Sequence, residues 1–291
     1  MAQRPAAEAF FLPAPNGERY CLYYAPAEGV VPRCALVYVH PFADEMNKCR
    51  RMAALQARAF ADAGHAVLQI DLHGCGDSSG DFGAARWETW HADISLAYDW
   101  LSRRQPAPVG LWGMRLGALL ALDFASRATH PVACVMLWQP VLNGALYMTQ
   151  FLRIRMAGDM LVGGKPEAGM QGVAPKANTT QAMRTTLAGG ESLEIGGYLL
   201  APELVKAIDP ITLAALGAPG MPVHWFEIIS EAGRTLPPAA NNAAAVLRER
   251  GVDLQVHLIA GPPFWASQEI VEAPLLLAAT LAWTEGVAAC T

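Results

Sequence analysis

The chain of 291 residues has few charged side chains, and they are not gathered into runs of one sign. Asp, Glu, Lys and Arg together make up 16% of the residues, and the formal net charge is −5. Proteins that bind nucleic acid or anionic lipid through charge carry basic clusters, and none is visible here. The sequence therefore favours a small ligand or a protein partner over nucleic acid.

Long apolar runs and a basic N-terminal leader are also missing. The longest apolar stretches, ALVYV, ACVMLW and APLLLAATLAW, are shorter than the roughly 20 residues that a membrane-spanning helix needs. The opening MAQRPAAEAFFLPAPNGERY has no basic segment followed by an apolar run and a small-residue cleavage site. We expect no membrane span, no signal peptide and a cytoplasmic protein.

The six cysteines are dispersed, and no two of them form a C-x-x-C pair. Zinc sites and disulfide frameworks depend on such spacings. We expect reduced, mostly buried thiols, with no metal and no cofactor.

Apolar residues, in contrast, are abundant: they make up 53% of the chain, enough for a large core. The run CALVYV at 34–39 predicts a strand buried on both faces, and Met52, Leu55, Ala59 and Phe60 then follow at helical spacing. The apolar segment HAVLQIDL completes one βαβ unit, and the alternation recurs up to the segment ACVMLWQ. Strands that alternate with helices predict a doubly wound, mostly parallel α/β sheet.

This alternation is interrupted after the sixth expected core strand. The segment 142–205 contains the helical stretch LYMTQFLRIRMAGDMLV, the glycine-rich GGKPEAGMQG and the hairpin-like SLEIGGYLL. The alternation resumes with the strand PVHWFEII at 222–229. We expect an α/β core made of residues 1–141 and 206–291, with residues 142–205 inserted as a cap over the carboxyl ends of the strands.

Ligands of open α/β sheets bind at the carboxyl ends of the strands, so the turns there matter most. VHPFADE resembles the turn that supplies one oxyanion-hole amide, and DLHGCGDSSG resembles the D-x-R-G-x-G-x-S loop of the α/β-hydrolase superfamily. GLWGMRLGA resembles the nucleophile elbow of the same superfamily. The three matches occur in the superfamily's order, which predicts an α/β-hydrolase fold.

A narrower resemblance covers most of the chain. The segment 40–90, together with LWQP, TQFLR and LEIGGYLL, is similar to the exosortase A system-associated hydrolase 2 family. That resemblance implies a bacterial protein encoded beside an export and exopolysaccharide system. It also implies a hydrolase acting on an ester, thioester or glycan-linked substrate, although no motif identifies the substrate.

The elbow pattern places Arg115 where the superfamily has its nucleophile. The turn is tight and needs small residues two positions before and after the nucleophile, and Gly113 and Gly117 meet that need. A guanidinium with a pKa above about 12 has no lone pair to offer at neutral pH. Arg115 is therefore not a nucleophile.

The other triad positions should follow as an acid and then a histidine. Glu231 follows the strand 222–229 and takes the acid position, whereas GPPFW places Pro263 where the histidine belongs. Loss of the nucleophile or of the base removes nearly all of a triad's covalent advantage. We therefore do not expect an ordinary serine-hydrolase mechanism.

An oxyanion hole is formed by backbone amides, so it does not depend on the side chains of a nucleophile or a histidine. The amides of Phe42 and Leu116 are placed to form an oxyanion hole, and Arg115 beside them would favour a carboxylate or phosphate. Alternatively, Arg115 pairs with Glu231 or Glu45 and fills a pocket that has lost its catalytic function.

Two functions from different classes follow. In an enzyme, water would attack an acyl substrate with help from Glu45 or Asp44, while the amides and Arg115 stabilise the oxyanion. In a non-catalytic binder, the same pocket would hold an anionic small molecule or a partner.

Four further residues are candidates for the substrate pocket: Asn47, His73, Pro263 and Arg153. Asn47, like Asp44 and Glu45, could instead serve the start of the helix that follows, and His73 could stabilise its loop. Arg153 could face solvent. Ser78 and Ser79, in a turn-rich loop, could replace the missing nucleophile, but such hydroxyls usually bond to the backbone.

Overall fold

The computed structural model describes residues 6–27, 30, 32–162 and 179–286. Its centre is an eight-stranded sheet with the strand order β1-β2-β4-β3-β5-β6-β9-β10. All neighbours from β4 to β10 are parallel, and β1 and β2 are antiparallel to their neighbours. The mostly parallel sheet confirms the predicted α/β-hydrolase fold. The strands are β1 Glu8–Ala14, β2 Gly17–Tyr24, β3 Ala35–Val39, β4 Ala66–Ile70, β5 Val109–Met114, β6 Val135–Trp138, β9 Pro222–Ile229 and β10 Asp253–Ala260.

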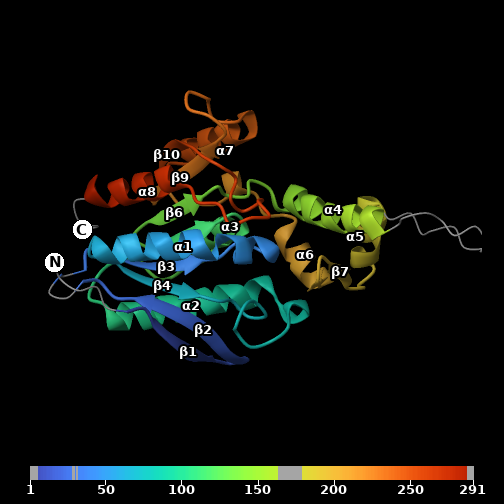
Figure 1. Ribbon diagram of the computed structural model, residues 1–291, viewed down its shortest axis with the longest axis horizontal. Coiled ribbons are helices and arrows are strands. Elements are labelled where there is room, and N and C mark those ends of the chain that lie inside the picture. Colours follow the sequence, from blue (N-terminus) through green and yellow to red (C-terminus); the bar gives the residue numbers. More distant parts are fainter. Residues whose placement is uncertain (1–5, 28–29, 31, 163–178, 287–291) are drawn as a thin grey trace, which may run out of the picture.

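The central strands are buried on both faces, as their continuous apolar sequences predict. Every residue of β3, β5 and β6 is buried. Helices α1 (Asp44–Asp62) and α8 (Pro274–Gly286) cover one face of the sheet. Helices α2 (Trp87–Arg104), α3 (Leu116–Arg127) and α7 (Pro238–Glu249) cover the other (Figure 1). The strands of a sheet that is covered on both faces have continuous apolar sequences.

The first two strands were not part of the expected element order. They form a hairpin whose two connecting residues are Pro15 and Asn16, and Gly17, the first residue of β2, has a φ of +97°. Pro, Asn and Gly are typical turn residues, and glycine adopts a positive φ at no steric cost. The sequence Pro15-Asn16-Gly17 was therefore a turn signal, although the expected element order did not include the hairpin.

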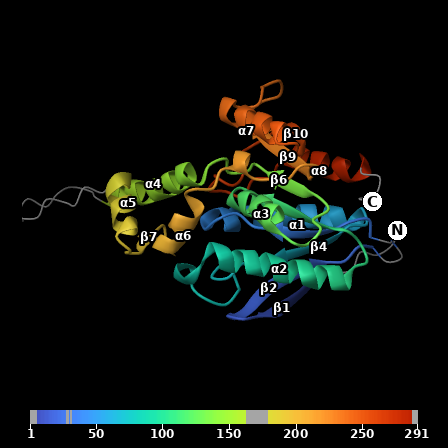
Figure 2. The ribbon, with the colours of Figure 1, turned by 180° about the vertical axis from the view of Figure 1, so that it is seen from behind.

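The segment after β6 lies beyond one end of the sheet in both views (Figures 1 and 2). Phe42, which follows β3, packs edge-on against Tyr147 and Phe151 of α4, so this is the end where the parallel strands finish. The expected glycine-rich loop at 163–172 lies outside the described residues. The elements are α4 Gly144–Val162, α5 Thr180–Ala188, β7 Leu193–Ile195, β8 Tyr198–Leu200 and α6 Pro202–Ile208.

Two short 3-10 helices, Phe82–Ala84 and Leu213–Ala215, complete the described elements. Among the helices of the described ranges, none is both long enough and apolar enough to cross a membrane.

Candidate functional site

Three non-glycine residues of the described chain have a positive φ: Ala43 at 51°, Arg115 at 55° and Gln139 at 44°. They follow β3, β5 and β6, which are adjacent strands in the middle of the sheet. Left-handed backbone at such residues is unfavourable and concentrates at functional sites. Its presence at three neighbouring strand ends marks the place where a site should be sought.

The elbow around Arg115 has no room for larger residues at the two glycines. A Cβ on Gly113 would lie 2.5 Å from the carbonyl oxygen of Gly117. A Cβ on Gly117 would lie 2.2 Å from the carbonyl oxygen of His40. The turn therefore brings the start of α3 against the turn after β3, and Arg115 occupies its central position.

The Arg115 side chain meets a carboxylate and two aromatic rings. Its Nη2 and Nε lie 3.3 and 3.4 Å from Oε1 of Glu45. Its guanidinium carbon lies 5.7 Å from the ring centroid of Tyr147 and 5.2 Å from that of Trp265. Rings at such distances attract a cation. Trp265 follows Pro263, so the loop without a histidine contributes an aromatic ring instead.

Glu45 is the acid that pairs with Arg115. Its Oε2 accepts a hydrogen bond of 3.1 Å from the Tyr147 hydroxyl. Burial raises the pKa of Glu45, and the charge of Arg115 offsets only part of that effect. Glu45 and Arg115 together occupy the position where the superfamily has its nucleophile.

The prediction that Glu231 serves this site is not supported. Its side chain is 67% exposed and pairs with Arg234 at 2.7 Å. The strand β9 ends at Ile229, and Glu231 lies in the following turn, where its partner is three residues away. The short-range pair holds the carboxylate at the surface.

A different carboxyl group, that of Glu227 within β9, was not among the predicted site residues. It is 5% exposed, and it accepts hydrogen bonds from Nε1 of Trp225 at 2.8 Å and from Nε2 of Gln139 at 3.1 Å. Burial raises its pKa, and these two hydrogen bonds offset part of that rise. A single acidic residue inside the apolar strand PVHWFEII was the signal.

Gln139 connects Glu227 to Arg115. Its Oε1 accepts a hydrogen bond of 2.6 Å from the amide of Ile228, and its carbonyl oxygen lies 3.5 Å from Nη1 of Arg115. Both ends of its amide group are thus engaged. The left-handed backbone of Gln139 places the carbonyl toward the arginine while the side chain holds the buried acid.

Arg115 and Glu227 line one cavity of about 570 Å³, a volume within the range of small-molecule sites. It lies between the segment after β6, helix α4 and helix α7. The sequence predicts that Arg115 projects into a pocket between Phe42, Glu231 and the inserted segment 142–205. Residues of α4 in that segment line this cavity, but neither Phe42 nor Glu231 is among its described lining residues. The polar lining residues are Arg115, Gln139, Asn143, Tyr147, Gln150, Thr212, Glu227 and Asn242.

The two amides expected to form an oxyanion hole have no protein acceptor within the described part of the chain: those of Phe42 and Leu116. Both residues border a small cavity of about 10 Å³, which holds no more than about one water molecule. The Phe42 ring is buried and packs edge-on against Phe82 and Phe151. The donors are retained, but this small cavity has no space for an acyl group.

Two other predicted site residues of α1 face away from the Arg115 cavity. Asp44 is 55% exposed and pairs with Lys48 at 2.7 Å. Asn47 is exposed, and its Nδ2 donates to the Tyr198 hydroxyl at 3.5 Å. On a helix, residues one and two positions from Glu45 point to different sides, which is why only Glu45 reaches Arg115.

The remaining predicted pocket residues also lie elsewhere. The backbone of His73 bonds to Oδ2 of Asp93 and to Nε1 of Trp90, and burial lowers the pKa of its ring. Arg153 lies on an exposed side of α4, and Pro263 is exposed. None of the three is among the described residues lining the cavity that holds Arg115.

The candidate replacement nucleophiles hold the N-terminal hairpin in place. The Ser78 hydroxyl donates to the carbonyl of Asp71 and accepts from the amide of Tyr20 at 2.8 Å. The Ser79 hydroxyl accepts from the amide of Glu18 at 2.9 Å. Burial raises the pKa of the nearby Cys75 thiol well above its usual value. Neither serine is paired with a base among the residues that the structure describes.

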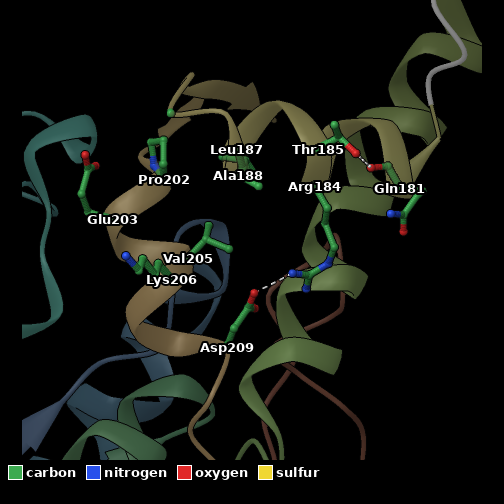
Figure 3. Close-up of a pocket in the computed structure, with 11 residues that line it drawn as sticks. Gln181, Arg184, Thr185, Leu187, Ala188, Pro202, Glu203, Val205, Lys206 and Asp209 are labelled. Atoms are coloured by element: carbon green, nitrogen blue, oxygen red, sulfur yellow. Dashed lines mark hydrogen bonds and ion pairs between the residues drawn. The ribbon is translucent and has the colours of Figure 1, made fainter.

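A second cavity of about 670 Å³ lies between α5 and α6 (Figure 3). Figure 3 shows Arg184 directed at Asp209, and the two groups lie 2.7 Å apart. The other guanidinium nitrogens of Arg184 donate to Thr149 and to the carbonyl of Ala145. Arg184 therefore links α4, α5 and α6. In the described ranges, no group of three or more His, Cys, Asp or Glu could hold a metal ion.

We predict that Glu227→Gln changes stability in a pH-dependent way. The folded-state pKa of Glu227 is raised, so its contribution to stability is present in acid and is lost as the pH rises through that pKa. Glutamine has no charge to desolvate, although it loses one hydrogen bond at every pH. The Tm of the variant minus that of the wild type should therefore increase from about pH 4 to about pH 8.

Asp123→Asn is the control of opposite sign. Burial acts to raise the pKa of Asp123, but hydrogen bonds from His91 and Trp87 hold it below its usual value. Its contribution to stability is lost as the pH falls, so this variant should lose most stability at neutral pH. A difference in Tm for Glu227→Gln that stays constant or falls with pH would contradict the prediction.

Comparison with known proteins gives a family and several structural neighbours. Residues 31–184 match the family described as serine aminopeptidase, S33. The chain is 30% identical over 132 residues to Protein ABHD12B of Homo sapiens, a stretch that covers 44% of this chain. That stretch is 34% of the human protein, so the chain spans about a third of this relative's length.

Solved structures cover nearly the whole chain. Est1E from Butyrivibrio proteoclasticus with bound ferulic acid has a TM-score of 0.62 at 14% identity, covering 96% of this chain and 98% of its own. A soluble variant of monoglyceride lipase from Saccharomyces cerevisiae, in complex with a substrate analog, has a TM-score of 0.65 at 13% identity. That match covers 98% of this chain and 97% of the lipase chain. At these identities the likeness shows the fold alone, which is the α/β-hydrolase fold.

Proposed function

This chain belongs to the serine aminopeptidase S33 family of α/β-hydrolases, and we propose that it binds an anionic small molecule beside Arg115 instead of performing covalent serine catalysis. The observation that carries the proposal is the Arg115–Glu45 pair at the centre of the elbow. A guanidinium in that position cannot attack a substrate. No histidine is among the described residues that line the cavity, so the histidine base of a triad is missing from this lining as well.

The guanidinium retains capacity for a ligand. Glu45 engages Arg115 through Nε and Nη2, and the contact of Nη1 with the carbonyl of Gln139 is long, at 3.5 Å. An arginine has five N–H donors, and its fork fits two oxygens of a carboxylate or phosphate. The side chain is 16% exposed, so a molecule in the cavity can reach it.

A hydrolytic alternative is supported by the pKa of Glu45. A carboxyl group whose pKa is raised can accept a proton from water near neutral pH, and Glu45 is such a group. Under this alternative the substrate is the ester, thioester or glycan-linked compound of an exosortase and exopolysaccharide context in the bacterial cytoplasm. Both oxygens of Glu45 already have protein partners, which favours the binding function.

We predict that a fluorophosphonate probe does not label the protein. The probe reacts with activated serines, and the elbow has an arginine while Ser78 and Ser79 bond to backbone groups. Intact-mass analysis after incubation should show unmodified protein, with a known serine hydrolase as the positive control. Stoichiometric labelling at Ser78 or Ser79 would establish a relocated nucleophile and overturn the proposal.

Binding is tested by titrating phosphate, citrate and octanoate into the wild type, Arg115→Lys and Arg115→Ala, with Tm as the readout. At 100 times its Kd, a ligand adds about 2.7 kcal/mol of stability. We expect at least one anion to stabilise the wild type, to stabilise Arg115→Lys less and to leave Arg115→Ala unchanged. Equal stabilisation of all three proteins, or of none, would contradict the proposal. Turnover of activated esters or thioesters above background that depends on Glu45 would favour the hydrolytic alternative.

A further inference from the structure

The cavity beside Arg115 is also lined by an acidic residue, which a simple anion does not complement. Glu227 lines this cavity together with Arg115, and Gln139 bonds to both. An anion held by Arg115 would therefore have a buried carboxyl group as its neighbour. Two carboxylates close together repel each other, so the ligand must offer more than negative charge.

Glu227 still has capacity to accept a hydrogen bond. Each of its oxygens accepts one bond from the protein, from Gln139 and from Trp225, and a carboxylate oxygen has two lone pairs. Gln139 cannot bridge a ligand to Glu227, because both ends of its amide group are already bonded, to Glu227 and to the amide of Ile228. A ligand that contacts Glu227 must itself donate a hydrogen bond.

The lining of the cavity also includes apolar side chains. Leu142, Leu146 and Val246 contribute to it, from the segment after β6, from α4 and from α7. Leu146 is 65% exposed and Val246 is 39% exposed, so both present apolar surface to an incoming molecule. Covering such side chains with a hydrocarbon chain is favourable. The cavity thus offers polar groups for a head group and exposed apolar side chains for a hydrocarbon chain.

We propose that the ligand class is a medium-chain hydroxy acid: its carboxylate binds Arg115, its adjacent hydroxyl donates to Glu227, and its hydrocarbon chain lies between Leu146 and Val246. This inference rests on the proposed function, since it specifies the anion held by Arg115. The hydrogen bond from the hydroxyl to Glu227 offsets the repulsion between the two carboxylates. Charge-assisted hydrogen bonds are stronger than neutral ones, so the hydroxyl should add clearly to the affinity.

The test compares matched ligands on the wild-type protein by isothermal titration calorimetry. The ligands are 2-hydroxyoctanoate, octanoate, 2-methoxyoctanoate and 2-hydroxypropanoate. We expect 2-hydroxyoctanoate to bind at least about tenfold more tightly than octanoate, a difference of about 1.4 kcal/mol. The methoxy compound, which has no donor, should bind no better than octanoate, and the short acid should bind weakly.

Two variants test the two proposed contacts separately, that of the ligand hydroxyl with Glu227 and that of the hydrocarbon chain with Leu146. Glu227→Gln should reduce the preference for the hydroxy acid over octanoate, and Leu146→Asn should weaken both long-chain acids by a similar factor. Equal affinity of octanoate and 2-hydroxyoctanoate for the wild type would overturn the inference and leave the proposed function standing. If no carboxylate and no phosphate binds, the proposed function itself fails. The ligand comparison needs only the wild type, so it is decisive even if a variant does not fold.

Discussion

Arg115→Ala is expected to destabilise the protein by about 2–4 kcal/mol at neutral pH, because it leaves Glu45 partly buried without its cation. The Glu45 side chain is 21% exposed, and the Tyr147 hydroxyl would be its one remaining close donor in the described site. The substitution also removes the contacts of the guanidinium with the rings of Tyr147 and Trp265. Alanine has the same difficulty with a φ of 55° as arginine, so backbone strain does not change.

The size of this effect should depend on pH. Without Arg115, the pKa of Glu45 rises further, and the carboxyl group becomes neutral when the pH falls below it. The loss of stability should therefore be smaller at about pH 4 than at about pH 7. Urea denaturation at both pH values measures it.

The double variant Arg115→Ala with Glu45→Gln is the matched control. It removes the unpaired charge, so it should recover part of the stability lost in Arg115→Ala. A single variant as stable as the wild type would show that the pair makes no net contribution. A double variant no more stable than the single one would show that the loss comes from packing alone.

Gly117→Ala is expected to prevent folding or to destabilise the protein by more than about 3 kcal/mol. The new Cβ would lie 2.2 Å from the carbonyl oxygen of His40 and 2.4 Å from that of Val39. Both are backbone atoms, and Val39 ends a fully buried strand in the middle of the sheet. Neither can move aside without disturbing the core.

Gly261→Ala is the control for this substitution. Its new Cβ would make ordinary contacts of 3.8 Å with Ala273 and Ile228, so we expect a change within about 1 kcal/mol. The yield of folded protein and the urea midpoint of both variants provide the comparison. A Gly117→Ala protein of wild-type stability would mean that the close approach of α3 to the turn after β3 is not required.

Much of the fold could be predicted because its signals are local. Buried parallel strands need unbroken apolar sequence, and CALVYV contains β3. The elbow needs small residues at fixed positions, and Gly113 and Gly117 identify it without knowledge of the rest of the chain. The N-terminal hairpin could also have been predicted from the turn-favouring residues Pro15, Asn16 and Gly17.

The sequence narrowed the partner of Arg115 to two carboxylates, those of Glu45 and Glu231, but did not identify which of them pairs with it. Both Glu45 and Glu231 lie in turns or helix starts near expected strand ends, and their side chains have the same chemistry. Glu231 pairs with Arg234 three residues later, whereas Glu45 reaches Arg115 across 70 positions of sequence. Glu231 is already paired with its neighbour Arg234, and Glu45 is the carboxylate that pairs with Arg115.

The sequence by itself determined the α/β-hydrolase fold, the position of Arg115 at the elbow and the lack of a serine nucleophile there, because each follows from backbone sterics or from the chemistry of one side chain. Only the tertiary structure decided what surrounds the guanidinium. Gln139 and Trp265 contact it from the segment after β6 and from the loop after β10, and Glu227 of β9 lines the same cavity. Contacts between elements so far apart in the chain depend on strand register and loop path, which no local pattern encodes.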